Sequence, residues 1–187
     1  MVRLRHAAPL VYRIDAGDRI SYLDPEWSAE HPAGAWPRLE PGNLLGRPLW
    51  DSLGDATVRE LYRAIIARVR AGRAFKFCYR CDTPDRGRLY GMKIRLCPEN
   101  EVEFASTLQR EQARPAIALL DPAPARDDRH VVAMCSWCQR IALPVDYWVP
   151  IEEAMLLGGF MEADPLPRLE AGVCPPCQRR LSRQLRA

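Results

Sequence analysis

The stretch FKFCYR at residues 75–80, followed by YGMKIRL at residues 90–96, decides the fold class of this chain. In both stretches, large apolar side chains alternate with polar or small ones, which is the period of a strand with one buried face. Residues 83–87 form the turn between them, and residues 102–108 continue the alternation after a second turn at residues 98–100. Three such strands in succession predict an antiparallel sheet with one face on the core.

The residues before this segment predict two more strands and a helix. Residues 10–15 and 19–23 are short apolar runs on either side of a turn, which indicates a hairpin. Residues 57–60 (Thr-x-x-Glu) have the spacing of a capping box, and Gly72 suits the end of the helix. The apolar face of this helix comprises Val58, Leu61, Tyr62, Ile65 and Val69. The order predicts an α+β fold, a five-stranded antiparallel sheet with helices on one face.

Two cysteine pairs near the C-terminus predict a metal site. Cys135 and Cys138 form one C-x-x-C spacing, Cys174 and Cys177 form another, and 35 residues separate the pairs. This spacing directs two sulfurs toward one point, and four thiolates complete the tetrahedral coordination of structural zinc without leaving a position for water. The alternatives are a redox dithiol and buried free thiols. We expect one structural Zn²⁺ within a small folded module.

A third C-x-x-C spacing, formed by Cys78 and Cys81, is predicted not to bind metal. Both residues belong to an expected strand, where side chains three residues apart point to opposite faces, about 10 Å apart at ~3.3 Å per residue. In a regular strand this also excludes a disulfide between them.

The same alternation predicts a basic outward face on the sheet. Lys76, Arg80, Lys93 and Arg95 fall on the side opposite the aromatic residues. Such a face suits a protein partner with an acidic surface, and the alternative is a solvated sheet face.

Composition is typical of a globular protein. Of the 187 residues, 48% are hydrophobic and 27% are charged. No apolar run approaches the roughly 18 residues needed to cross a bilayer. The first residues lack the apolar length of a signal peptide, so we expect a cytoplasmic protein whose seven cysteines stay reduced. A net charge of +3 is too small to imply nucleic acid by itself.

Much of the chain resembles a group of bacterial stand-alone PAS-like proteins that carry a short cysteine-rich tail. In the sheet region the resemblance lies in residues 12–15, 18–20, 45–51 and 79–84. In the tail it lies in the Met-Cys-Ser-Trp-Cys segment, a tryptophan-containing stretch before an acidic helix, and the Gly-Val-Cys-Pro-Pro-Cys segment, at residues 134–138, 147–153 and 172–177. The resemblance implies a PAS-like domain with a sensory role, because related tails also follow bacterial sensor modules.

One residue departs from the resemblance, and three histidines bear on possible cofactors. A histidine often stands where this chain has Ala171, but the four cysteines suffice for zinc without it. A PAS haem sensor usually takes its axial ligand from the long helix, and residues 57–71 contain no histidine; His6, His31 and His130 lie elsewhere. The Asn-Cys-Arg segment of flavin photosensors is absent from the sequence. We therefore expect neither haem nor flavin.

These observations predict a PAS-like domain at residues 9–110, a proline-containing linker at 111–129 and a four-cysteine zinc-binding module at 130–187. The sequence contains neither a nucleophile elbow nor a phosphate-binding glycine loop, so we expect no enzyme.

We expect a non-enzymatic bacterial sensory, signalling or protein-interaction protein. Its partners would be another protein or a second copy, and a small-molecule ligand in the PAS-like cavity. The alternative is a zinc-ribbon transcriptional regulator that contacts nucleic acid through a short basic helix at residues 178–186. Acidic residues near that helix make nucleic acid the less favoured partner. A third alternative is an enzyme with its site in the cavity.

Overall fold

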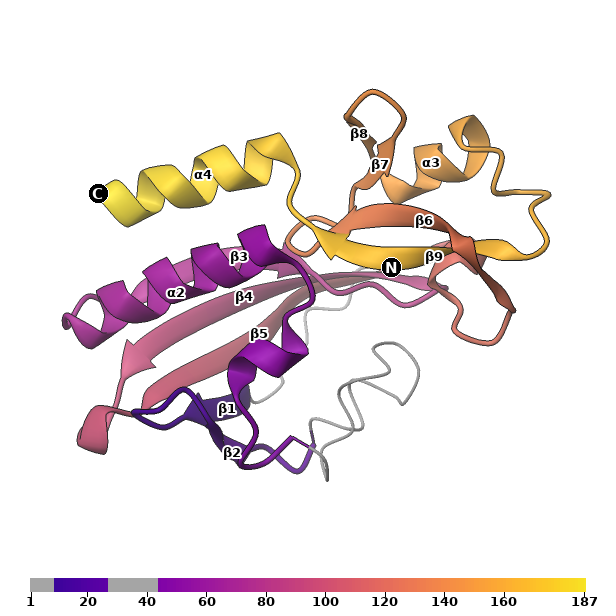
Figure 1. Cartoon of the computed structure of the whole chain (residues 1–187). Coiled ribbons are helices and arrows are strands. Elements are labelled where there is room, and N and C mark those ends of the chain that lie inside the picture. Colours follow the sequence, from indigo (N-terminus) through magenta and orange to yellow (C-terminus); the bar gives the residue numbers. More distant parts are fainter. Residues whose placement is uncertain (1–8, 27–43) are drawn as a thin grey trace.

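Figure 1 shows the computed structural model of the chain, which describes residues 9–26 and 44–187. Its larger part is a five-stranded antiparallel sheet in the order β2–β1–β5–β4–β3. The strands are β1 (Leu10–Ile14), β2 (Ile20–Leu23), β3 (Phe75–Arg80), β4 (Arg86–Leu96) and β5 (Val102–Ala113). Helix α2 (Ala56–Arg70) packs on one face of the sheet. The short 3-10 helix η2 (Leu49–Ser52) precedes α2, and η3 (Pro98–Asn100) lies in the turn between β4 and β5. The predicted α+β class, with a five-stranded antiparallel sheet and a helix on one face, is confirmed.

Strand alternation sorts the sheet side chains as predicted. Phe75 and Phe77 of β3 are buried, whereas Lys76 between them is exposed. In β4, Met92 and Ile94 are buried, and the intervening Lys93 is exposed. The buried face packs against α2, whose core residues are Val58, Leu61, Ile65, Ile66 and Val69.

The start of α2 differs from the predicted capping box. The helix begins at Ala56, and Asp55 is its N-cap, since the Val58 N–H donates to Asp55 Oδ1 at 2.9 Å. Thr57 therefore lies inside the first turn and cannot serve as the cap. The C-terminal prediction is confirmed, because Gly72 follows the helix with φ of 83°, a left-handed conformation that glycine adopts without strain.

The cap can be tested by substitution. We expect Asp55→Ala to lower the free energy of unfolding by about 1 kcal/mol, because an N–H at the helix start loses its acceptor. Thr57→Ala is the control and should change it by less than about 0.5 kcal/mol. Denaturant titration measures both, and equal losses in the two variants would restore Thr57 as the cap.

The C-terminal part contains a second sheet that the sequence analysis did not predict. Its order is β8–β7–β6–β9, with β6 and β9 parallel and the other pairs antiparallel. The strands are β6 (Arg126–Cys135), β7 (Ile141–Leu143), β8 (Tyr147–Val149) and β9 (Leu166–Gly172). Helix α3 (Ile151–Leu157) follows β8, and α4 (Pro175–Arg186) ends the chain beside α2 (Figure 1). The predicted first turn at Pro175 is confirmed.

The segment predicted as a linker contains ordered elements. Strand β5 extends to Ala113, η4 (Ala118–Leu120) follows, and β6 begins at Arg126. Ile117 and Leu119 are buried in the core beneath the second sheet. The domain boundaries themselves stay a prediction. No helix in residues 9–26 or 44–187 is long and apolar enough to span a membrane.

Two hydrophobic cores organise the molecule, and the first crosses from one part to the other. It contains the buried residues of the five-stranded sheet and α2, together with Cys135, Trp137, Cys174, Cys177 and Leu181 of the C-terminal part. The second core lies within the C-terminal part, around residues such as Ile141, Ile151 and Phe160. The four-cysteine region is thus packed against the PAS-like sheet.

Candidate metal centre and adjoining cavity

The first cysteine pair lies in a tight turn at the end of β6. The Cys135 N–H donates to the Arg140 carbonyl at 2.8 Å, and the Gln139 N–H donates to the Cys135 carbonyl at 2.9 Å. Gln139 has φ of 56°, a left-handed conformation that reverses the chain immediately after Cys138. These bonds turn the side chains of Cys135 and Cys138 to the same side of the loop.

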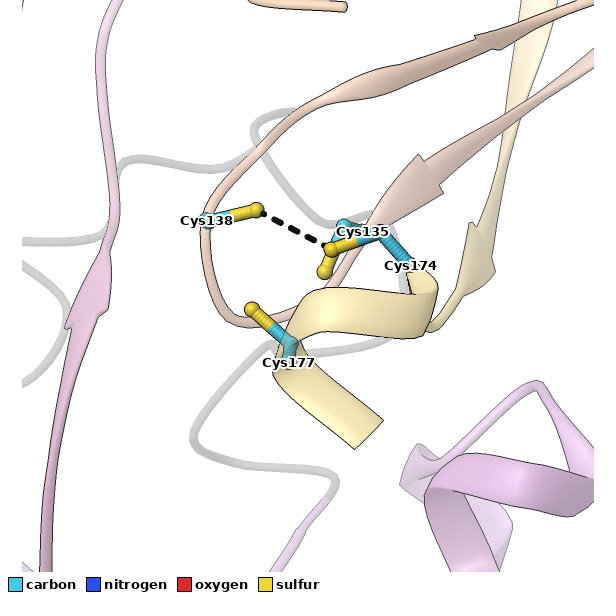
Figure 2. A group of neighbouring side chains, drawn as sticks. All are labelled: Cys135, Cys138, Cys174 and Cys177. Atoms are coloured by element: carbon cyan, nitrogen blue, oxygen red, sulfur yellow. Dashed lines mark hydrogen bonds between the residues drawn. The ribbon is translucent and has the colours of Figure 1, made fainter. Parts of the chain in front are cut away.

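The second pair lies at the start of α4. Cys174 is the N-cap residue of this helix, and Cys177 is in its first turn. The parallel strands β6 and β9 bring the two pairs together, because Cys135 and Gly172 are register partners and the Ser136 N–H donates to the Gly172 carbonyl at 2.9 Å. Figure 2 shows the four side chains converging from these two segments.

The four sulfurs form a compact group. All of them lie within 4.8 Å of one another, and the Sγ atoms of Cys138 and Cys174 are 3.5 Å apart. Zinc at about 2.3 Å from each sulfur would place the sulfurs roughly 3.8 Å apart in a tetrahedron. A disulfide needs about 2.05 Å, so these separations fit a metal ion and not a bridge. The four predicted ligands Cys135, Cys138, Cys174 and Cys177 are brought together and could hold a metal such as zinc.

Hydrogen bonds among the four thiols shift their pKa values in opposite directions. Hydrogen bonds from the thiols of Cys138, Cys174 and Cys177 hold the pKa of Cys135 far below its ordinary value. The bonds made with Cys135 raise the pKa of Cys138 and that of Cys177. A bound cation would replace these shared protons, because metal ligation deprotonates thiols. Arg180 also lies near the group, with its guanidinium 4.0 Å from Cys177 Sγ.

Trp137, the residue between the first two cysteines, anchors the turn to the PAS-like sheet. Its side chain is 2% exposed and packs on Tyr62 of α2 and Phe77 of β3, at ring distances of 5.8 and 6.1 Å. The Trp137 carbonyl accepts a hydrogen bond from the N–H of Arg80, the last residue of β3, at 2.8 Å. The metal loop is therefore fixed to both the sheet and α2.

A small cavity lies where these parts meet. Its volume is about 190 Å³. Sheet and helix residues line one side, including Tyr12, Val58, Tyr62, Tyr79 and Met92. The cysteine module lines the other with Met134, Cys135, Ser136, Gln139 and Ala171. A metal ligand and its immediate neighbours are thus part of the cavity wall.

The cavity is mostly apolar. Arg80 also lines it and is paired with Asp82, and the other polar groups of the lining include three tyrosine hydroxyls. Burial raises the pKa of Tyr62 to about 12 and raises that of Tyr12 and of Tyr79 well above the ordinary value. These hydroxyls therefore stay protonated at neutral pH, and that of Tyr79 forms a hydrogen bond with the Ser106 hydroxyl. They can bind a polar group of a ligand but do not provide a general base near neutral pH.

A buried ion-pair network joins the two parts beside the cavity. The Asp82 side chain is fully buried and pairs with Arg80 and with Arg114, whose Nη1 lies 2.9 Å from Asp82 Oδ2. Arg114 also reaches Glu152 of α3 at 2.8 Å, and the Asp82 N–H donates to Gln139 Oε1 at 2.9 Å. The sequence analysis missed this network, because its members come from distant segments without a local motif.

Among the residues that the structure describes, Cys78, Cys81, Cys97 and His130 do not join the metal cluster. Cys78 is exposed on the open sheet face, whereas Cys81 lines the internal cavity, so their predicted opposite orientation is confirmed. His130 lies in β6 and is exposed, with its ring 6.1 Å from Phe160. His6 and His31 lie outside the described residues.

The sheet order and the cysteine cluster define the chain as an α+β protein with a five-stranded antiparallel sheet and a four-cysteine module. Neither a protein-family model nor a curated protein matches it. Among solved structures, it is similar to a domain of an HTR-like protein from Haloarcula marismortui, with 14% identity and a TM-score of 0.39, over 55% of this chain and 98% of that one. It is also similar to the PAS domain of the RpfR quorum-sensing receptor from Cronobacter turicensis in complex with C12:0, with 13% identity and a TM-score of 0.39. This match covers 57% of this chain and 98% of that one.

Proposed function

We propose that this chain is a non-enzymatic sensory or protein-interaction protein. In this proposal, the loop that holds a structural Zn²⁺ also forms part of the wall of a small-ligand cavity. The observation that carries this proposal is the composition of the cavity, which the PAS-like sheet, α2 and the cysteine loop line together. A ligand that fills the cavity would contact the loop that holds Cys135. Its binding would then be coupled to the order of the C-terminal module, and the output would be contact with a partner protein.

Cavity size and lining restrict the class of ligand. An engineered apolar cavity of about 150 Å³ binds benzene, so 190 Å³ suits a molecule slightly larger than benzene. Drug-sized ligands fill roughly 300–1,000 Å³. Protonated tyrosine hydroxyls and the Gln139 amide favour one neutral polar group on an otherwise apolar molecule. Indole has this chemistry and is the probe that we choose.

Ala171 provides a test of this proposal that leaves the metal ligands intact. Ala171→Leu adds three carbon atoms to the cavity wall, at the point where Ala171 faces Gly54. We expect the affinity for indole to fall at least about tenfold, which corresponds to roughly 1.4 kcal/mol. Isothermal titration calorimetry of the zinc-loaded protein measures this change.

The matched control is Ala142→Leu, the same substitution in β7 away from the cavity. It should leave indole affinity unchanged, and both variants should keep their zinc. Absence of indole binding in the unmodified protein, or equal affinity in the Ala171→Leu variant, would contradict the proposed ligand site.

A further inference from the structure

The open face of the five-stranded sheet contains a second, larger hollow on the side opposite the ligand cavity. Its volume is about 1020 Å³. Residues of three neighbouring strands form its centre, and Arg180 and Gln184 of α4 border it near β3. We call it the basic hollow, and its central residues are Lys76, Cys78, Gly91, Lys93, Ala105 and Thr107.

Two lysines at the centre of the basic hollow lack a counter-charge. Lys76 and Lys93 are register partners on β3 and β4, and both are exposed. They are the only lysines of the chain. Within residues 9–26 and 44–187, neither ammonium group forms an ion pair. Like charges directly opposite each other on a sheet are destabilising, so this arrangement favours an anionic partner.

The acidic group nearest the centre is already neutralised. Glu103 Oε1 lies 2.6 Å from Arg95 Nε, and its Oε2 lies 3.0 Å from an Arg13 nitrogen. The hydrogen bond from Arg95 is the main cause that lowers the pKa of Glu103. This corrects the predicted docking face, because Arg95 is paired with Glu103 and Arg80 is paired with the buried Asp82. Lys76 and Lys93 are the cations of that face left to bind a partner.

Small residues lie beside the lysines in the basic hollow. Ala105 and Thr107 have short side chains, whereas the side chain of Gln109 covers Gly91, and its amide nitrogen would clash with a Cβ at that position. Arg180 reaches in from α4, where its guanidinium lies 3.4 Å from the Cys78 carbonyl. Together, five cations and two carboxylates line the hollow, the second carboxylate being Asp24 at the rim.

We propose that the basic hollow is the docking site for an acidic segment of a partner protein, whose carboxylates pair with Lys76, Lys93 and Arg180. This proposal rests on the proposed output through protein contact and names the chemistry of the partner. A second copy docked face to face would bring two sets of like charges together. Single-stranded nucleic acid is also disfavoured, because it needs exposed aromatic rings for stacking, and Tyr22 at the rim already lies beneath Arg13.

The test uses a fluorescein-labelled peptide of ten glutamates and the zinc-loaded full chain. Fluorescence anisotropy at low salt should detect binding that weakens as salt rises, since exposed charges are screened. Lys76→Glu with Lys93→Glu should lower the affinity at least about tenfold, whereas Lys76→Arg with Lys93→Arg should retain it. In a ¹H–¹⁵N spectrum, the peptide should shift the amide signals of Gly91 and Thr107.

The matched control is Arg183→Glu with Arg186→Glu, which makes the same change of charge on exposed residues of α4 outside the hollow. Its affinity for the peptide should stay within about twofold of the unmodified protein. No peptide binding, an equal loss in the control, or tighter binding of a thymidine oligonucleotide would overturn the proposal. Unchanged zinc content and indole affinity in the Lys76→Glu, Lys93→Glu variant would show that the failure concerns the docking site alone.

Discussion

Replacing Cys174 with serine should release the metal and loosen the C-terminal module. Tetrahedral zinc needs all four thiolates, and structural zinc contributes an apparent 10–16 kcal/mol, roughly, in small zinc-binding peptides. After dialysis, we expect the variant to retain roughly 0.1 equivalent of zinc per chain or less. The unmodified protein should retain about one equivalent. Elemental analysis measures the metal, and hydrogen exchange should show faster amide exchange over residues 130–187.

The effect should extend beyond the module itself. Cys174 belongs to the same core as Trp137, which packs on Tyr62 and Phe77 of the PAS-like part. Amide exchange near those two aromatic residues should therefore also rise. Cys78→Ser is the matched control, because Cys78 is exposed and lies outside the cluster. Full zinc content in the Cys174→Ser variant, or zinc loss in the control, would contradict the four-cysteine site.

Removing the carboxylate of Asp82 should strongly destabilise the fold, although Asp82 lies outside the metal centre. Asp82→Ala leaves the guanidinium groups of Arg80 and Arg114 without their buried partner. Breaking a buried ion pair in this way costs about 3–5 kcal/mol. Because both arginines also reach Glu152, we expect the lower end of that range, about 3 kcal/mol. Denaturant unfolding of the zinc-loaded protein measures the loss.

Asp85→Ala tests whether burial is the reason for this effect. The Asp85 side chain is 65% exposed, and its pair with Arg86 spans 3.7 Å. Exposed pairs contribute about 0–1 kcal/mol, so this variant should unfold at nearly the same denaturant concentration as the unmodified protein. Similar losses in the Asp82→Ala and Asp85→Ala variants would mean that the buried network does not hold the two parts together.

The five-stranded sheet could be predicted from the sequence because half-buried strands keep a period of two residues. The runs around Phe77 and Met92 show this period clearly, and their burial agrees with it. The second sheet could not be predicted in the same way. Strands β7 and β8 have three residues each, which is too short to show a period, and β6 pairs with β9 only after an intervening helix.

The candidate metal residues were predictable, but their surroundings were not. C-x-x-C spacing is a local signal, because both sulfurs belong to one turn. The surface on which Trp137 packs depends on tertiary structure, and so does the position of Ala171 in the cavity wall. The same holds for the ion pairs of Asp82, which joins segments 32 residues apart in its pair with Arg114. The sequence therefore predicted a separate zinc module, whereas the cysteine cluster shares its core with the PAS-like sheet.

The most direct measurement of the central proposal is the affinity for indole with and without bound zinc. Titration calorimetry would compare the zinc-loaded protein, the same protein after chelation, and the chelated protein after zinc is restored. Because Cys135 and Ser136 line the cavity, we expect chelation to weaken indole binding at least about tenfold and zinc to restore it. Equal affinity in all three samples would contradict the proposal that the metal-binding loop forms part of the ligand cavity and supports ligand binding.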